Sequence, residues 1–554
     1  MDATSTISTP FSRYWKLFVD HSFLTPDLLH VEFQGEGTQE RPYVVEWTQN
    51  DARDPKKWSS RYKWMLVITV AIETLVVSFC SSVYSGGLRD VMREFDVSEE
   101  VATLGLSFFV LGFALGPLLW APLSELYGRQ VVFVGTFFAF TAFNAGAAES
   151  KNIQSLLILR FFAGSFGSSP LTNAGGVTAD LFDARERGQA LSIFCLAPFL
   201  GPVLGPVAGG FLGENEGWRW IGRLMTMFSG TLLILGTIVV PETYAPVLLR
   251  KRASQLSKLT GKVYRTRDDI DRGPLTVGQI IQINLIRPWV LLFRELIVLT
   301  LSIYLAIIYG ILYMLFGAFP IVYQQERGWS PGIGGLPFLA IAIGMVLAIA
   351  YSVFIEQPRY LRVVDACRGF APPEARLPAT IIGGCTFPVG LLWFAWTNSP
   401  SVPWEASVAA GIPFGFGMVL VFIGVLGYLI DAYTIFAASA LAANSILRSL
   451  FGAAFPLFTK QMYSNLGIHW ASSLAGFLAL ACLPFPVLFY KYGRQIRLKS
   501  KYSAEAEAFM VALGERMAAV AEESRGPSGG SAAPTIDVPD DASGKVQKEN
   551  VGEA

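Results

Sequence analysis

The chain has 554 residues, of which 52% are hydrophobic and only 16% are charged, and its formal net charge is zero. Soluble globular proteins carry about 25% charged residues, so the deficit indicates an apolar surrounding, and the balanced charge gives no reason to expect a nucleic-acid partner. The three histidines are scattered, the five cysteines show no CxxC spacing, and no Ser/His/Asp arrangement is visible. We therefore expect no metal site, no cofactor and no enzyme.

Residues 1–61 are polar and of mixed charge, with no apolar run after a basic start. This pattern argues against a signal peptide. We expect a cytoplasmic N-terminal segment, followed by a first hydrophobic helix that acts as an uncleaved insertion signal. The sequence assigns no role to residues 1–53, which we expect to be disordered or loosely folded.

Apolar runs long enough to cross a bilayer recur along the chain, since about 20 apolar residues suffice. The first six runs are 62–84, 101–123, 131–149, 153–179, 189–213 and 221–241. The second six are 297–319, 332–354, 379–397, 407–430, 434–458 and 469–490. The sequence therefore predicts an all-α membrane protein with about twelve transmembrane helices.

The polar stretch between the two sets divides the chain into two bundles of six helices. We expect an N-terminal bundle over 62–241, a cytoplasmic central loop over 242–296 and a C-terminal bundle over 297–490. The tail, 491–554, begins with basic residues and becomes rich in Gly, Ser, Pro and Asp, so most of it is predicted to be disordered. Lys and Arg concentrate in the central loop, in loop 356–376 and at the start of the tail. The positive-inside rule then places both termini in the cytoplasm.

Glu73 is the clearest polar residue at membrane depth. It lies about eleven residues into the first predicted span, which is about 16 Å along a helix and close to the bilayer midplane. A carboxyl group there is costly and usually functional or paired. It could bind and release a proton, or recognise a cationic substrate, as a cavity opens. The alternative is a protonated carboxyl group that makes one structural hydrogen bond.

Two arginines and two asparagines are further candidates inside the predicted spans. Arg160 lies in the fourth span and, because arginine stays charged, it must find partners or water. It either lines a cavity or clamps backbone carbonyl groups. Arg448, in the eleventh span, has the same two alternatives. Asn173 and Asn444 are weaker candidates, since asparagine within a span often only joins neighbouring helices.

Residues 116–130 read GPLLWAPLSELYGRQ and connect the second and third spans. Gly116 permits close approach of a neighbouring helix, and Gly128 permits a tight turn. Glu125 can lie against a helix N-terminus, where the dipole favours an anion. Arg129 can pair with an acidic residue, for which Asp180, at the inner end of the fourth span, is the candidate.

The fifth span contains a run of small residues, APFLGPVLGPVAGG, at 197–210. Its glycines recur every fourth position and form one smooth face, while two prolines bend the helix. We expect this face to contact a helix of the opposite half. The segment comprises Gly201, Pro202, Gly205, Pro206, Gly209 and Gly210.

Together these segments resemble the major facilitator superfamily. Residues 116–130 resemble its inner-loop signature, 157–176 (LILRFFAGSFGSSPLTNAGG) its fourth-helix signature, and 197–210 the segment typical of its proton antiporters. Further stretches, among them PETYAPVLLRKRA at 241–253 and YLIDAYTIFAASALAANSILRSLFGAAFPLF at 428–458, resemble fungal drug:proton antiporters and polyamine-type carriers. The resemblance implies two six-helix bundles, alternately open to either side, with the inner-loop cluster acting as a gate latch.

The resemblance also implies the function. We expect a proton-coupled transporter that exports a small organic compound, either a drug or a fungal secondary metabolite. A polyamine carrier and an organic-acid carrier are the alternatives. No Walker A sequence is present, so ATP is not expected to drive transport directly.

The expected partners are the lipid bilayer, the substrate and protons, and the expected assembly is a monomer. We expect a multi-pass protein of the plasma membrane, with the vacuolar membrane as an alternative. Aromatic residues such as Tyr309 and Tyr313 are expected to line an apolar cavity, although packing is the commoner role for rings at such spacing.

Overall fold

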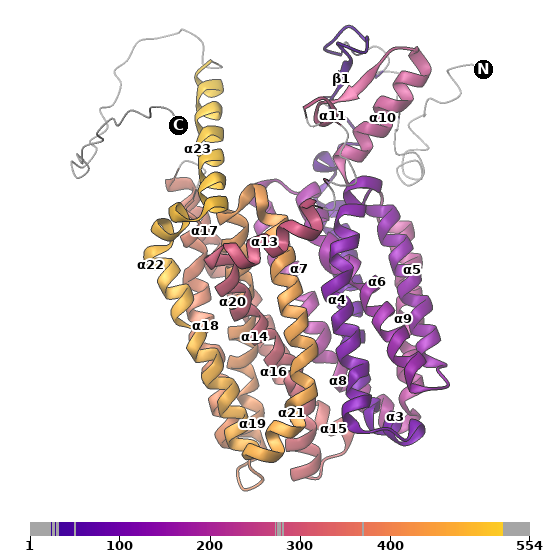
Figure 1. The fold of residues 1–554 in the computed structure, drawn as a ribbon, viewed down its shortest axis with the longest axis vertical. Helices are drawn as coiled ribbons and strands as arrows, with labels where there is room; N and C mark the ends of the chain where they lie inside the picture. Colours follow the sequence, from indigo (N-terminus) through magenta and orange to yellow (C-terminus); the bar gives the residue numbers. More distant parts are fainter. Residues whose placement is uncertain are drawn as a thin grey trace, which may run out of the picture. The chain divides into compact units, whose positions relative to one another are not determined.

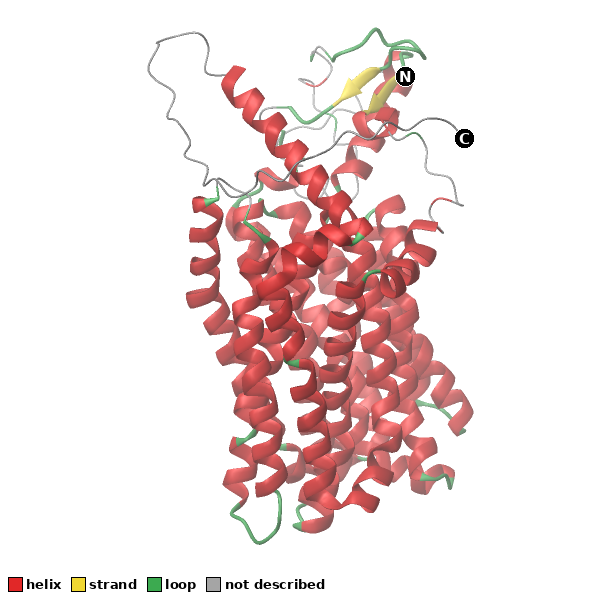
Figure 2. Ribbon diagram, turned by 60° about the vertical axis from the view of Figure 1, so that its left-hand side comes forward, coloured by secondary structure: helices red, strands yellow, loops and turns green. Residues whose placement is uncertain are grey.

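In the residues that it describes, the structure, a computed structural model, consists almost entirely of helices, with one pair of short strands (Figure 2). It describes residues 33–48, 51–271, 282–367 and 371–523, together with Leu24, Leu28, Val31, Gly273 and Gln279. The predicted disorder after about residue 524 lies outside these described residues. The chain divides into two compact units, Met1–Ala506 and Glu507–Ala554, and helix α23 (Lys501–Glu523) extends from the first into the second. All the membrane-spanning helices found among the described residues belong to the first unit.

Ten helical segments of the described chain are long and apolar enough to cross a membrane. One of them, Thr434–Lys499, is 66 residues long, and Gly467 interrupts it with φ 73° and ψ 166°, so it supplies two crossings. Helix α6 (Ile153–Leu181) is less apolar, because it carries several Ser, Thr and Asn residues, but it packs along α4 (Glu99–Tyr127) over its length. The described residues therefore contain the twelve crossings that the sequence predicts.

The crossings form two bundles, which occupy different sides of the molecule in Figure 1. The N-terminal bundle contains α4, α6, α2 (Ser60–Val83), α5 (Arg129–Ala148), α7 (Ala184–Phe194) with α8 (Ala197–Glu216), and α9 (Trp218–Val239). The C-terminal bundle contains α14 (Leu296–Phe319), α15 (Pro331–Gly335) with α16 (Phe338–Tyr351), α18 (Leu377–Thr397), α20 (Gly411–Ala432), α21 (Ala437–Cys482) and α22 (Pro484–Lys499). Shorter helices connect them: α3 (Leu88–Phe95), α17 (Gln357–Ala366) and α19 (Trp404–Ala409).

Two predicted spans are not continuous helices. The fifth span breaks at Cys195 and Leu196, just before Pro198 in the first turn of α8. The eighth breaks between α15 and α16, where Pro337 precedes the second helix. Proline has no N–H group to donate and is favoured in or just before the first turn of a helix, so each new helix begins at a position that proline favours.

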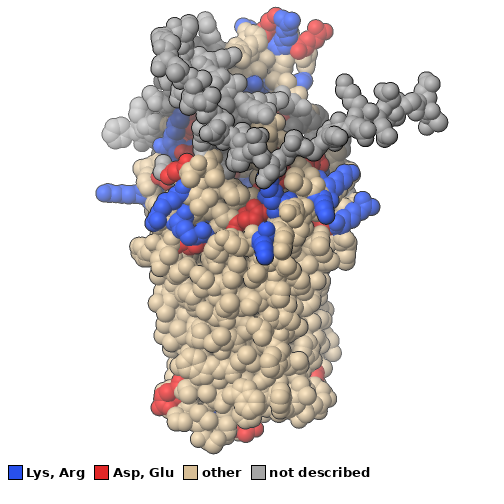
Figure 3. Space-filling view, turned by 90° about the vertical axis from the view of Figure 1, so that its left-hand side faces the viewer, with Lys and Arg blue, Asp and Glu red and all other residues tan. Residues whose placement is uncertain are grey.

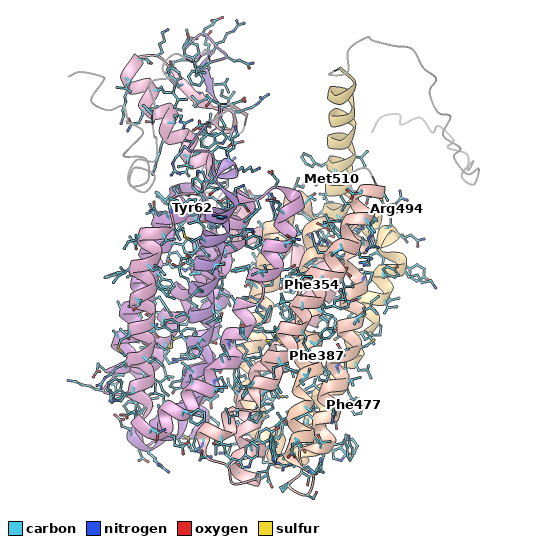
Figure 4. The ribbon with its side chains drawn as sticks, turned by 180° about the vertical axis from the view of Figure 1, so that it is seen from behind. Tyr62, Phe354, Phe387, Phe477, Arg494 and Met510 are labelled. Atoms are coloured by element: carbon cyan, nitrogen blue, oxygen red, sulfur yellow. The ribbon has the colours of Figure 1, made fainter. Side chains whose placement is uncertain are left out.

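The lateral surface of the body is apolar, as a surface in contact with lipid must be. Phe354 and Phe477 are 77% and 51% exposed, whereas Phe387 is fully buried within the C-terminal bundle; all three are labelled in Figure 4. In Figure 3 the Lys and Arg side chains gather in a band at one end of the body, a few Asp and Glu side chains lie at the opposite end, and the middle shows no charge. We call the end that carries this band, together with the turn between α4 and α5, the basic end.

The central stretch between the bundles is folded rather than a loop. It contains α10 (Ala245–Thr260), α11 (Arg267–Asp271) and α13 (Arg287–Arg294). Strand β1 (Tyr43–Val45) of the N-terminal segment pairs in parallel with β2 (Tyr264–Thr266) of this stretch. The expectation of a loose segment before residue 54 is therefore wrong for residues 33–48, because they find a partner more than 200 residues away in sequence.

A buried ion pair fixes this contact. Arg252 of α10 donates from Nη2 to Asp51 Oδ1 at 3.2 Å, and the two side chains are only 2% and 4% exposed. The Trp47 ring lies 5.0 Å from the guanidinium carbon of Arg252. Burial alone would raise the pKa of Asp51, but the Arg252 guanidinium and the backbone N–H of Arg53 outweigh burial and lower the pKa below its usual value. We call residues 33–48 and 51–58, together with α10 and β2, the clasp.

Candidate functional site

A cluster of polar residues surrounds the turn between α4 and α5 at the basic end. Gly128 makes the turn with φ 104°, a conformation that only glycine adopts readily. Glu242, fully buried beyond α9, accepts hydrogen bonds from the backbone N–H groups of Arg129 and Gln130 at 2.9 and 3.1 Å. Its carboxylate therefore occupies the N-terminus of α5, where the helix dipole favours an anion.

This observation corrects the role predicted for Glu125. Glu125 is exposed, and Glu242 instead occupies the helix N-terminus. Sequence reasoning missed Glu242, although it lies in the PETYAP segment that was singled out. Gly116 behaves as expected, because a side chain there would overlap Ser165 and Ser168 of α6.

Arg129 is the centre of the same cluster. Its Nε lies 3.4 Å from Asp180 Oδ2, the pairing that the sequence indicates. Its Nη1 donates to Ser124 Oγ, which in turn donates to Asn173 Oδ1 at 2.8 Å. Asn173 therefore belongs to the polar cluster at the basic end and not to a central cavity. The Tyr244 ring covers the guanidinium, with 4.7 Å from its centroid to Arg129 Cζ.

The C-terminal bundle carries a corresponding cluster, which sequence reasoning missed. Arg376 Nε donates to Asp431 Oδ2 at 3.0 Å, and the Tyr360 hydroxyl donates to the same oxygen at 3.1 Å. Nearby, Arg497 Nε donates to Glu374 Oε1 at 3.0 Å. The acidic residues lie in the segments PEARLP and YLIDAY, so a search for carboxyl groups at span ends could have found them.

Arg160 is enclosed within the N-terminal bundle. Its Nε donates to the carbonyl of Gly105 at 2.6 Å, and its Nη2 donates to the carbonyls of Cys80 and Ser81, both at 3.3 Å. The rings of Tyr84 and Phe109 lie 4.3 and 4.9 Å from Arg160 Cζ. Of the two alternatives, this geometry favours the clamp on backbone carbonyl groups.

Glu73 is 5% exposed and lies between α2, α5 and α9. Its carboxyl group fills the space beside Gly236, and Gln130 and Thr237 border the same shallow pocket. No hydrogen bond to the carboxyl group is found within the described residues. The carboxyl group of Glu73 therefore faces α5 and α9 of its own bundle and not the surface where the two bundles meet.

The two bundles meet along a surface that we call the seam, formed by α2, α4, α7 and α8 on one side and by α14, α15, α16, α20 and α21 on the other. Near its middle the hydroxyl groups of Ser81 and Tyr313 are 2.8 Å apart, and the ring centroids of Phe199 and Phe422 are 4.5 Å apart. Tyr309 and Tyr313 thus lie at the seam, as expected of aromatic residues that line a path between the bundles.

Arg448 also lies at the middle of the seam. Its guanidinium carbon is 5.0 Å from the centroid of the Tyr309 ring and 5.8 Å from that of Phe422. Its Nε and the Nδ2 of Asn444, one helical turn earlier, are buried without a hydrogen-bond partner in the described structure. Arg448 and Asn444 are therefore the predicted polar residues that face the seam.

Side-chain and backbone contacts close the seam at both ends. At the end opposite the basic end, Lys460 Nζ lies 2.7 Å from Glu99 Oε2, and the Gly332 N–H donates to Glu214 Oε2 at 2.9 Å. At the basic end the hydroxyl groups of Ser192, in α7, and Ser352, beyond α16, are 3.4 Å apart. The middle of the seam is thus enclosed in this conformation.

The glycine segment of α8 is only partly as predicted. The backbone of α2 lies directly against Gly201, Gly205 and Gly209, so the smooth face packs within its own bundle. The expectation that this face contacts the opposite half is wrong, because the contact across the seam comes from positions turned about 100° away. There Gly210 lies against Pro331, and the carbonyl of Pro206 against Gly335. Pro202 is buried within the helix.

Two helical bundles that enclose polar and aromatic residues at their common surface define a secondary transporter fold. Comparisons agree with this class. The family model of the Major Facilitator Superfamily matches residues 70–456. The chain belongs to the major facilitator superfamily.

Individual relatives and a solved structure that resemble this chain are also known. The chain is 59% identical over 513 residues to the MFS-type efflux pump MFS2 of Trichophyton rubrum, covering 93% of this chain and 86% of that protein. It is 59% identical over 504 residues to the multidrug transporter mdrA of Aspergillus fumigatus, covering 91% and 83%. The solved proton:xylose symporter XylE matches the fold with a TM-score of 0.57 at 16% identity, covering 78% of this chain and 96% of that one.

Proposed function

We propose that this protein is a proton-coupled exporter of small organic compounds, a drug or a fungal secondary metabolite, and that it works by alternating access. The observation that carries the proposal is the seam. Its middle holds buried donors without partners between aromatic rings, and both of its ends are closed by contacts that can be exchanged. Opening one end at a time would expose this region to one side of the membrane.

The curated relatives support the direction of transport. Two proteins that are 59% identical over most of this chain are named as an efflux pump and a multidrug transporter. A third, 52% identical over 511 residues, is the efflux pump FUB11 of Gibberella moniliformis. Export of a small organic compound is the activity that these names have in common.

Glu73 is the proposed proton site. No other carboxyl group lies in the middle of a described span. The group is buried, and the bordering Gln130 at the start of α5 lies toward the basic end. A carboxyl group in such a place can bind and release a proton as its access to water changes. Coupling would then pass from the N-terminal bundle to the seam through α2, which carries both Glu73 and Ser81.

The polar clusters at the basic end are the proposed gate latches. Arg129 with Asp180, and Arg376 with Asp431, tie the ends of neighbouring helices together within each bundle. Rocking of the bundles would change the spacing of these helix ends. We place the basic end in the cytoplasm of a plasma-membrane protein, because Lys and Arg favour the cytoplasmic side, and we expect a monomer.

The seam argues against the polyamine alternative. An ammonium group requires carboxylates or carbonyl oxygens around it. The one charged side chain that the structure places at the middle of the described seam is the guanidinium of Arg448, which would repel it. The Arg448 region is compatible with neutral or anionic compounds.

Transport into inside-out membrane vesicles tests the proposal. A pH gradient, acidic inside, should drive accumulation of a fluorescent efflux substrate, and an uncoupler should abolish it. Glu73→Gln should remove the dependence on the gradient. Glu149→Gln, an exposed acidic residue that pairs with Arg223, is the matched control and should behave as wild type. Accumulation that ignores the gradient in the wild type would contradict proton coupling.

A further inference from the structure

We infer that Arg448 and Asn444 form a binding site for a carboxylate group of the exported compound, so that the preferred substrates are organic acids with an apolar, aromatic or conjugated body. The inference rests on the proposed function, because only a compound that enters the seam can reach these residues. It adds the chemical class of the substrate and the residues that select it.

The two residues share one face of α21, and this face is directed across the seam. They are four positions apart, so their side chains lie one above the other on the helix. The next position on the same face is Gly452. A side chain there would meet the ring of Tyr309 in α14 of the same bundle at 2.9 Å and Val110 in α4 of the opposite bundle at 3.2 Å. Asn444 and Arg448 are therefore directed toward the surface where the bundles separate.

Both residues have unused hydrogen-bonding capacity. Arg448 Nε and Asn444 Nδ2 are buried, and neither has a partner in the part of the chain that the structure describes. No ion pair of the described residues involves Arg448, whereas the arginines of the polar clusters at the basic end pair with carboxylates. Buried donors are nearly always satisfied in folded proteins, and here two unsatisfied donors share one helix face at the surface where the bundles separate, where a partner from outside the chain can reach them.

The chemistry of the donors selects a carboxylate. A guanidinium presents two parallel N–H groups, which match the two oxygens of a carboxylate. The side-chain amide of Asn444 can donate a further hydrogen bond. No described acidic side chain lies at the middle of the seam to compete, since Glu73 faces its own bundle. An anionic group would thus complete the site, and an ammonium group would not.

The walls of the site suit the remainder of such a compound. The rings of Tyr309 and Phe422 flank Arg448, and Phe199 of the opposite bundle lies against Phe422. The hydroxyl groups of Tyr309 and Tyr313 are 3.3 Å apart and provide polar contacts at the edge. Flat apolar molecules stack well on such rings, whereas a small inorganic anion would leave the rings unused.

Binding to the purified protein tests the inference separately from transport. The probes are aromatic carboxylic acids, each with its primary amide of the same ring system. Affinity is measured by quenching of tryptophan fluorescence, with sodium chloride varied. The wild type should bind the acid about tenfold more tightly than the amide. In Arg448→Gln the acid should lose this advantage, Arg448→Lys should restore part of it, and Asn444→Ala should reduce it.

The matched control is Arg223→Gln, which removes an exposed arginine of the N-terminal bundle and should keep the preference. Equal binding of acid and amide by the wild type would overturn the inference, even if proton-driven export of neutral compounds succeeds. Competition by chloride as strong as that by the acid would overturn it as well, because the site would then serve an inorganic ion. If vesicle transport fails but the preference for the acid depends on Arg448, the proposed function fails and the site stands.

Discussion

Two arginines lie inside the membrane part of this protein, and their surroundings differ. Arg160, in the interior of the N-terminal bundle, donates to three backbone carbonyl groups and is covered by two rings. Arg448, at the seam, has two rings beside it but a buried Nε without a partner in the described structure. From sequence alone the two look alike, since each is a lone cation in an apolar run.

The difference separates residues that hold a bundle together from residues that face a moving surface. A buried donor without a partner costs about 1–3 kcal/mol, and more when it is charged. Arg160 avoids this cost through its three carbonyl partners, whereas Arg448 and Asn444 at the seam retain it. A site that must release its ligand in one conformation cannot be permanently occupied by the protein's own groups.

The largest expected effect is the difference in stability between variants that lack Arg160 and variants that lack Arg448. Arg160→Met should lower the free energy of unfolding by about 3 kcal/mol or more, because three carbonyl groups lose a charged donor at once. Arg448→Met should change it by less than about 1 kcal/mol, because no hydrogen bond of Nε is lost. Melting temperatures in detergent, followed by size-exclusion fluorescence, measure both. Equal losses of stability in the two variants would contradict the distinction between a structural arginine and one that faces the seam.

A third arginine, Arg252 in the clasp, extends the comparison outside the membrane. Asp51→Asn should cost about 3 kcal/mol locally, because it removes the carboxylate charge that lies against a buried guanidinium. Limited proteolysis should then cut between β1 and α2 at pH 7 in the variant but not in the wild type. A cleavage pattern unchanged by the substitution would show that the ion pair does not hold the clasp.

The pH dependence of the clasp has a definite sign. The pKa of Asp51 is lower in the folded clasp than in the unfolded chain, so the pair stabilises the clasp above the unfolded pKa of about 4. This contribution is lost as the pH falls through the folded pKa. Protease resistance of the wild type should therefore be constant from pH 8 to about pH 5 and should decrease only in stronger acid.

Two glutamates at the turn between α4 and α5 test whether a buried, hydrogen-bonded charge contributes more to stability than an exposed one. Glu242→Gln should destabilise the protein by about 1–3 kcal/mol, because the carboxylate accepts backbone hydrogen bonds at a helix N-terminus. Glu125→Gln, at an exposed position nearby, should change stability by no more than about 0.5 kcal/mol. Thermal unfolding of the two variants measures both effects. A larger loss of stability in Glu125→Gln would support the interaction with a helix N-terminus that the sequence assigned to Glu125.

The smallest effect is expected at the end of the seam opposite the basic end. The Lys460–Glu99 pair is partly exposed, with side chains 54% and 28% accessible, so its loss should shift the opening of this end by no more than about fivefold. In Glu99→Gln, a cysteine introduced at Ser81 should react faster with a membrane-impermeant thiol reagent. An unchanged rate would show that this pair does not help to close the seam.

Sequence reasoning was sufficient for features that depend on local pattern. Twelve apolar runs predicted twelve crossings, since span length is set by bilayer thickness. Arg129 and Asp180 were paired correctly, because both fall at the same ends of neighbouring spans.

Features that depend on distant partners could not be read from local pattern. Glu242 caps a helix that begins 113 positions earlier, and β1 pairs with a strand in the central stretch. The orientation of the Glu73 side chain could not be predicted from the sequence either. Helix α2 is apolar on nearly every side, so its hydrophobic periodicity does not mark the face that meets the other bundle. The same limit applied to the glycine face of α8, whose partner is α2.

The most direct test of alternating access at the seam is a reversible cross-link between the bundles. Ser192 and Ser352, whose hydroxyl groups are 3.4 Å apart at the basic end, can be replaced by cysteines in a Cys195→Ala background. The control is Asn144→Cys, which faces Cys80 within the N-terminal bundle. Oxidation should stop vesicle transport in the Ser192/Ser352 variant and a reductant should restore it, whereas the control should transport in both states. Wild-type transport by fully cross-linked protein would contradict the account, because the seam would then not need to open.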